Sequence, residues 1–161
     1  MKSWPLLRTV HLLVGVAGLG AFLATGLFMD RRLDHLVGMA DGPRALYRSG
    51  HIYILFSALL HVLIGVYFIR SRSLPGRLVQ TAGSALLFVS LGLFLYGFFV
   101  ETPIGAIERP MIRNAIVWSL AGVLLHGIGS LAGGRETAPA RTAAAAASPR
   151  AAVLDREGGG V

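Results

Sequence analysis

The residues most able to do chemistry in this chain are histidines that lie inside apolar stretches. His61 is near the middle of Ser49–Ile69, a run of roughly 20 residues with no acidic or basic side chain. His11 and His126 occupy similar apolar surroundings. An ionisable group at such a position is costly in a membrane, and it indicates a ligand, a proton-transfer group or an interhelical hydrogen bond.

The three histidines are predicted to lie at similar depths. His11 is about five residues into its span, while His61 and His126 precede the ends of theirs by about eight and six residues. At the rise of an α-helix these depths are roughly 8, 12 and 9 Å from one membrane face. We therefore expect one layer of imidazoles in the bilayer half that is nearer to the termini.

Each histidine also has a glycine one helical turn away, namely Gly15, Gly65 and Gly122, and a short repeat relates HLLVGV from His11 to HVLIGV from His61. A missing side chain beside a ligand leaves room for a flat macrocycle, and two imidazoles on facing helices can hold haem iron. Arginines predicted near the same membrane surface can pair with the haem propionates; these are Arg8, Arg70 and Arg135.

This pattern resembles small four-helix membrane cytochromes of the b type. The resemblance rests on the histidine and glycine positions, and it implies haem b as cofactor, with two axial ligands drawn from His61, His126 and His11. We take His61 with His126 as the first choice because both lie well inside their spans. His51 and His35 are interpreted as ordinary interfacial residues.

Other uses of the three histidines stay open. They can form hydrogen bonds between helices, handle protons or quinone, or bind zinc or copper as the metal ligands His61, His126 and His11. The chain has no cysteine, which excludes disulfides, thiolate metal sites and thiol catalysis. No acidic residue lies within a span to orient a histidine base, so a hydrolase finds little support, and no catalytic residue is assigned.

Composition indicates an integral membrane protein. Of the 161 residues, 54% are hydrophobic and only 14% are charged, and the charges are confined to short segments between apolar runs. The net charge of +7 is attributed to arginines that flank the spans, and nucleic acid is not expected as a partner.

The predicted fold class is an all-α integral membrane protein, with four antiparallel transmembrane helices in a bundle. A short interfacial amphipathic helix is expected within Asp30–Arg48, ended by Asp41-Gly42-Pro43, and Gly83, Ser90 and Gly97 form a small-residue stripe for helix packing. The expected domain covers residues 1–134, with spans at about 6–29, 49–69, 79–100 and 114–132, and residues 135–161 form a disordered tail rich in Ala, Arg and Gly.

An even number of spans places both termini on one side, and the basic residues near that side favour the cytoplasm. We expect a bacterial inner membrane protein that passes electrons within the bilayer, with quinone or a membrane redox protein as partner. Two alternatives are a non-enzymatic accessory or assembly subunit of a larger membrane complex, and a proton or metal carrier. The sequence does not decide whether the protein is an enzyme.

Overall fold

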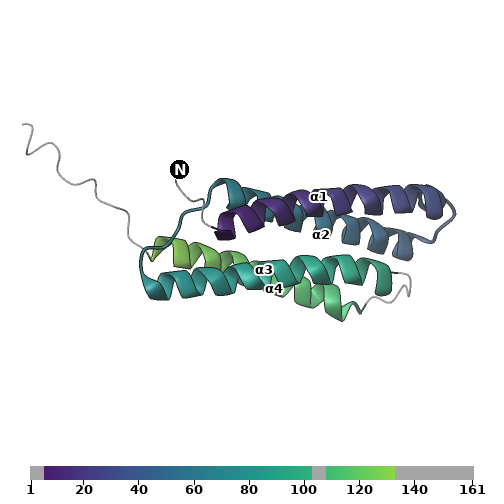
Figure 1. Cartoon of the computed structure of the whole chain (residues 1–161). Coiled ribbons are helices and arrows are strands. Elements are labelled where there is room, and N and C mark those ends of the chain that lie inside the picture. The colour runs from purple at the N-terminus through teal and green to yellow at the C-terminus, as the bar shows by residue number, and fades with distance from the viewer. Residues whose placement is uncertain (1–5, 103–107, 133–161) are drawn as a thin grey trace, which may run out of the picture.

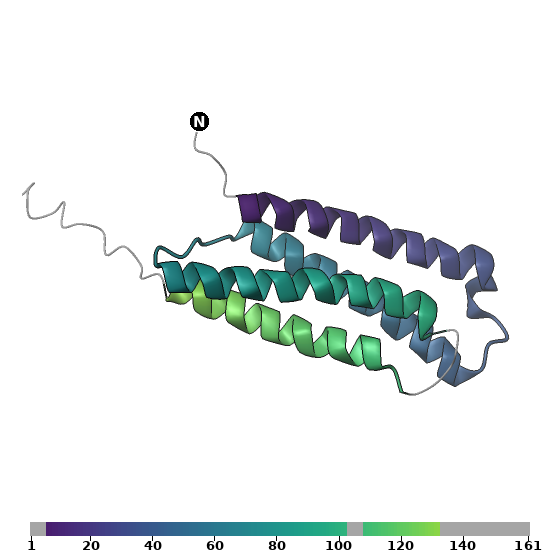
Figure 2. The ribbon, with the colours of Figure 1, turned by 60° about the horizontal axis from the view of Figure 1, so that its bottom comes forward.

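The computed structural model describes residues 6–102 and 108–132, which form four long helices running in alternating directions (Figures 1 and 2). The helices are α1 (Leu6–Arg32), α2 (Asp41–Val66), α3 (Leu74–Val100) and α4 (Pro110–Leu131). All four are long and apolar enough to cross a membrane. The predicted all-α bundle of four spanning helices is therefore confirmed.

The ends of the bundle differ in their connections. α1 and α3 begin, and α2 and α4 end, at what we call the Arg8 end, where Arg8 Nε donates a hydrogen bond of 2.9 Å to the Gly65 carbonyl. The other end, which we call the Glu101 end, holds the α1–α2 connection and the end of α3. Arg8 thus caps the last turn of α2, where carbonyl groups lack partners within the helix.

The helices pack as two close hairpins, α1 with α2 and α3 with α4 (Figure 2). A Cβ added to Gly15 of α1 would lie 2.7 Å from the Val62 amide nitrogen of α2, and one added to Gly122 of α4 would lie 2.9 Å from the Gly83 carbonyl oxygen of α3. Only glycine permits such close backbone approach. The predicted packing stripe on the third span is confirmed at Gly83, which faces α4, and at Gly97, which meets Ile112.

At the Glu101 end, polar side chains complete the start of α4. The buried Glu101 carboxylate accepts from the amide nitrogens of Met111 at 2.7 Å and Ile112 at 3.1 Å. Arg109 donates to the hydroxyls of Ser49 and Thr102 at 3.1 and 3.0 Å. Burial lowers the pKa of Arg109, and the nearby Glu101 carboxylate opposes that shift, so the guanidinium stays charged.

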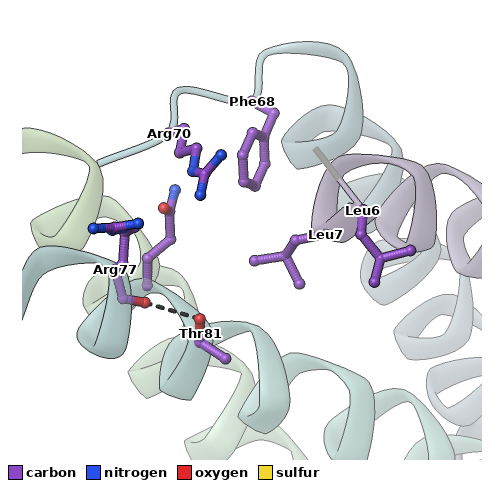
Figure 3. Close-up of a pocket in the computed structure, with 7 residues that line it drawn as sticks. Leu6, Leu7, Phe68, Arg70, Arg77 and Thr81 are labelled. Atoms are coloured by element: carbon purple, nitrogen blue, oxygen red, sulfur yellow. Dashed lines mark hydrogen bonds between the residues drawn. The ribbon is translucent and has the colours of Figure 1, made fainter. Parts of the chain in front are cut away.

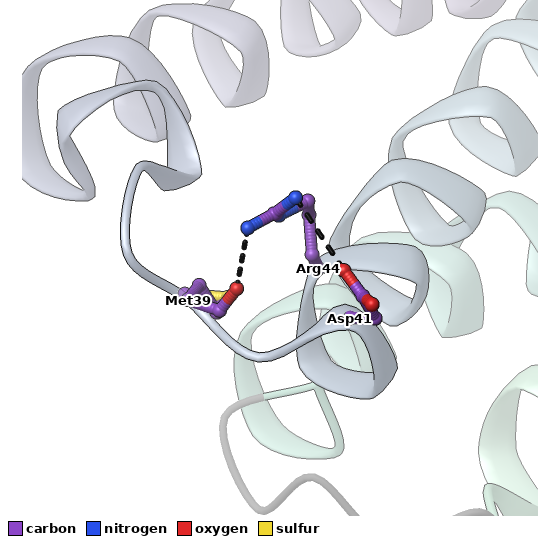
Figure 4. Close-up of polar contacts among 3 residues, drawn as sticks. All are labelled: Met39, Asp41 and Arg44. Atoms are coloured by element: carbon purple, nitrogen blue, oxygen red, sulfur yellow. Dashed lines mark hydrogen bonds and ion pairs between the residues drawn. The ribbon is translucent and has the colours of Figure 1, made fainter.

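The predicted interfacial helix is wrong in extent. Within Asp30–Arg48 a separate helical segment is confined to a 3₁₀ turn, Asp34–Leu36, whose residues all have positive φ and so cannot continue a right-handed helix. Asp41-Gly42-Pro43 begins α2 instead of ending a helix, because proline is tolerated in a first turn. Arg44 secures this start by donating to the Met39 carbonyl at 2.6 Å, and it pairs with Asp41 at 3.5 Å (Figure 4).

The remaining boundaries shift modestly. Apart from α2, the largest change is in α3, which begins at Leu74, where the Ser73 hydroxyl accepts from the Gly76 amide at 3.1 Å. Ser73 is thus an N-cap followed by Pro75 in the first turn, a standard start signal. The predicted tail of residues 135–161 lies outside the described residues.

The close α3–α4 contact gives a stability test. Gly83→Ala places a methyl group against the backbone of α4 and is expected to destabilise the protein by about 1–3 kcal/mol. Gly92→Ala is the matched control on the same helix, because a Cβ there meets nothing within 4 Å. Unfolding would be followed by circular dichroism in mixed micelles with increasing SDS. Equal midpoints for the two variants would contradict the packing described here.

Candidate functional site

The structure brings the three intramembrane histidines together near the Arg8 end. His11 and His61 are fully buried and His126 is 6% exposed. His11 Nδ1 lies 2.9 Å from His61 Nδ1, and the centroids of the His11 and His126 rings are 5.6 Å apart. The predicted layer of imidazoles is confirmed, and its members come from α1, α2 and α4.

The third helix, α3, links His126 to the other two rings. Its Ser84 hydroxyl lies 2.9 Å from His11 Nε2 and 2.9 Å from His126 Nδ1. Gln80, one turn earlier on α3, places its side-chain nitrogen 3.4 Å from His126 Nε2. Ser84 and Gln80 are both buried, and neither was predicted from the sequence as part of the site. The sequence signal that could have identified Gln80 and Ser84 is their spacing of four residues within an otherwise apolar span.

Phe88 of α3 covers the two fully buried imidazoles. Its ring centroid lies 4.7 Å from that of His11 and 4.9 Å from that of His61, and it is stacked on His61. An apolar wall keeps competing hydrogen-bond partners away from these rings. The imidazole nitrogens therefore depend on one another, on Ser84 and on the backbone.

The inner end of the cluster fixes the tautomer of His61. His61 Nε2 lies 3.3 Å from the Leu87 carbonyl oxygen, which can only accept. Nε2 therefore carries the hydrogen, and in the neutral ring Nδ1 is an acceptor. It follows that His11 Nδ1 donates to His61 Nδ1, which leaves His11 Nε2 as an acceptor for the Ser84 hydroxyl.

Ser84 fixes the tautomer of His126. Its single hydroxyl hydrogen is donated to His11 Nε2, so the contact with His126 needs a hydrogen on His126 Nδ1. His126 Nδ1 therefore donates to the Ser84 oxygen, and His126 Nε2 is unprotonated in the neutral ring. The Ser71 amide donates to Gln80 Oε1 at 3.3 Å, which leaves the Gln80 NH₂ group on the side of His126 Nε2.

The neutral cluster is thus a chain in which every donor points the same way. It runs from His126 through Ser84 and His11 to His61 and ends on the Leu87 carbonyl. Ser84 also has a second acceptor, the Gln80 carbonyl oxygen at 3.0 Å. If His11 gains a proton at Nε2, the Ser84 hydroxyl can rotate to that carbonyl and accept from His11. The cluster can therefore hold one added proton without losing a hydrogen bond within it.

The space beside the glycines that neighbour the histidines is occupied by adjacent helices. A Cβ on Gly65 would lie 2.9 Å from the Leu12 amide nitrogen, and Gly15 and Gly122 are equally close to α2 and α3. These positions serve helix packing and do not form an open slot. The packed arrangement therefore does not fit a haem beside these glycines, since a macrocycle there would require the two helices of a hairpin to move apart. Haem b binding stays a prediction from the sequence.

A metal site finds no support in the described residues, which hold no group of three or more His, Cys, Asp or Glu side chains able to bind an ion. Imidazoles that share a zinc ion lie about 2.0–2.1 Å from it, so their nitrogens are about 3.3 Å apart. The 2.9 Å between His11 and His61 is a hydrogen-bond distance, and His126 reaches His11 only through Ser84.

The arginines proposed for propionates lie at the Arg8 end but have separate surroundings. Arg8 donates to Gly65, as described above. Arg70 lines a pocket of about 230 Å³ together with Arg77 and Gln80, with Phe68 and Leu7 at its apolar side (Figure 3). Arg135 lies outside the described residues.

His51 has a more defined position than an ordinary interfacial residue. Its ring stacks on Phe22 with centroids 4.0 Å apart, and its Nδ1 lies 2.9 Å from the Thr25 hydroxyl. Gly26 makes room for it, because a Cβ there would lie 3.2 Å from the imidazole. His35 pairs with Asp30 at 2.7 Å in an exposed position near the same end. Neither residue joins the three-histidine cluster.

Comparisons with protein-family models, curated proteins and solved structures find no match for this chain.

Haem binding is decided by the absorption spectrum of detergent-purified protein produced with added haem. From the packing at Gly15, Gly65 and Gly122 we expect no Soret band and no α band after reduction with dithionite. A Soret band that is lost in both His61→Ala and His126→Ala would contradict this expectation and establish the haem site predicted from the sequence. His51→Ala is the matched control for loss of an imidazole elsewhere.

Proposed function

We propose that this chain is a multi-pass membrane protein that accepts and releases one proton within the bilayer. The observation that carries the proposal is the continuous hydrogen-bonded chain His126–Ser84–His11–His61, which we call the imidazole relay. Histidine is the side chain best suited to exchange protons near neutral pH, and buried chains of such groups are typical of proton relays.

The relay serves only one half of the membrane. It ends at the Leu87 carbonyl, which also accepts from the Ser90 hydroxyl at 3.1 Å. Further towards the Glu101 end the buried hydroxyls of Ser57 and Ser119 have no hydrogen-bond partner among the described residues, and the core is otherwise mainly apolar. Leu91, Phe94 and Phe98 follow on α3, with Ile54 on α2, and all are buried. A proton held by the relay therefore returns to the Arg8 end or passes to a bound partner, and it has no described polar path across the bilayer.

Charge supports an orientation with the Arg8 end in the cytoplasm of a bacterial inner membrane. Among described residues this end has four arginines and no carboxylate; they are Arg8, Arg70, Arg72 and Arg77. At the Glu101 end, six arginines are accompanied by five carboxylates. Arginine-rich ends stay on the cytoplasmic side. Protons would then exchange with the cytoplasm.

The capacity of one proton can be tested by NMR of ¹⁵N-histidine protein in nanodiscs. At neutral pH we expect hydrogens on His126 Nδ1, His11 Nδ1 and His61 Nε2, and on acidification one proton shared by His11 and His61. Ser84→Ala removes the acceptor for the charged His11 ring and should weaken proton binding about tenfold. Ser57→Ala is the control, since its buried hydroxyl has no partner among the described residues. Two imidazoles becoming cationic together would contradict the proposal.

Because no hydrogen-bonded chain continues beyond Leu87 and Ser90 among the described residues, we predict that the protein does not conduct protons across the bilayer. In proteoliposomes with a valinomycin-imposed potential and an internal pH dye, proton influx should equal that of protein-free vesicles. Gramicidin provides the positive control. An influx that requires His11, shown by its loss in His11→Ala, would instead demonstrate a complete path and overturn the half-membrane assignment.

A further inference from the structure

His126 Nε2 is an acceptor that the protein serves poorly. The nearest donor is the Gln80 NH₂ group at 3.4 Å, and that group has shorter bonds to the Ile69 carbonyl at 2.8 Å and the Ser130 hydroxyl at 2.9 Å. Both hydrogens of the Gln80 NH₂ group thus already have closer acceptors than His126 Nε2. A buried acceptor without a good donor is unfavourable in hydrocarbon, which indicates a donor from outside the chain.

A pocket borders this ring between α2 and α4. Its volume is about 350 Å³, and its lining is mostly apolar. Leu63, Ile64 and Tyr67 of α2 form one side, and His126 and Ser130 of α4 form the other. Leu63 and Tyr67 are 53% and 73% exposed on the surface that faces lipid. A ligand dissolved in the bilayer can therefore reach His126 without crossing water.

A second pocket lies between the same two helices, nearer to the Glu101 end. It has a volume of about 310 Å³ and includes Phe56 on α2 and Leu120 on α4. In the first pocket, Leu63 lies seven residues after Phe56 on α2, and Gly127 lies seven residues after Leu120 on α4. Each separation is about 10 Å along its helix. Ser119 also lines the second pocket, and its buried hydroxyl has no partner among the described residues. The two pockets thus follow one another along α2 and α4, in the arrangement that a head group and an apolar tail would need.

We propose that these two pockets between α2 and α4 bind a quinol, a lipid-soluble ligand with a hydroxylated aromatic head and an apolar tail. The head would donate a hydroxyl hydrogen to His126 Nε2 beside the Tyr67 ring, and the tail would lie along Phe56 and Leu120. Neither pocket is lined by a lysine or an arginine, so an anionic phospholipid head group would lack a permanent counter-charge. This inference deepens the proposed function and rests on it. It treats His126, at the outer end of the imidazole relay, as the residue to which a proton is supplied.

The test uses decylubiquinol under anaerobic conditions, titrated into ¹⁵N-histidine protein in nanodiscs at neutral pH. We expect a saturable shift of the His126 Nε2 resonance. The dimethyl ether of the same quinol has no hydroxyl hydrogen, and it should bind about tenfold more weakly because one hydrogen bond is lost. His126→Ala should weaken quinol binding by a similar factor, whereas His51→Ala, at the opposite end, should bind as the wild type does.

Leu63→Trp keeps the test decisive if His126→Ala does not fold, because it fills the pocket from a lipid-facing position. It should abolish the His126 shift while the one-proton titration without ligand is retained. Equal binding of quinol and dimethyl ether, or binding unaffected by both variants, would mean that the probe only partitions into lipid and would overturn the site. Loss of the one-proton titration with quinol binding intact would reject the relay and leave the ligand site standing.

Discussion

The absence of water inside the bilayer controls how this bundle is built. Every imidazole nitrogen at that depth needs a partner within the protein, since an unpaired polar group in hydrocarbon is costly. Ser84 meets this need at the centre, because one hydroxyl lies within 2.9 Å of two histidines and 3.0 Å of a backbone carbonyl. The cluster therefore joins the two close hairpins, with His11 and His61 on one and Ser84 and His126 on the other.

Glycine has a different role from the one suggested by its spacing. Gly15, Gly65 and Gly122 do lie one turn from histidines, but they bring helix backbones together rather than making room for a cofactor. The two uses of glycine look identical in sequence, because both need the absence of a side chain on an inward-facing position. Only the register between helices distinguishes them, and no local pattern specifies that register.

The number of spans and the depth of the histidines could be predicted because apolar run length and helical rise determine both. The Ser84 and Gln80 contributions could not, since neither side chain is ionisable and serine is common in packed membrane helices. The start of α2 was missed for a different reason. Asp41-Gly42-Pro43 is compatible with a helix end or a helix start, and the hydrogen bond from Arg44 to the Met39 carbonyl, which favours the start, depends on the conformation of the preceding turn.

The directionality of the imidazole relay follows from groups that are not histidines. The Leu87 carbonyl can only accept, and the Ser84 hydroxyl has one hydrogen to donate, so these two groups impose one sense on the three imidazoles. Gln80 lies at the outer end of the relay and accepts from the Ser71 amide, which belongs to the α2–α3 connection. The backbone carbonyl of the same residue gives the Ser84 hydroxyl its second acceptor. Gln80 thus links the surface connection to the relay, whereas the direction of the relay is set inside the bundle by Leu87 and Ser84.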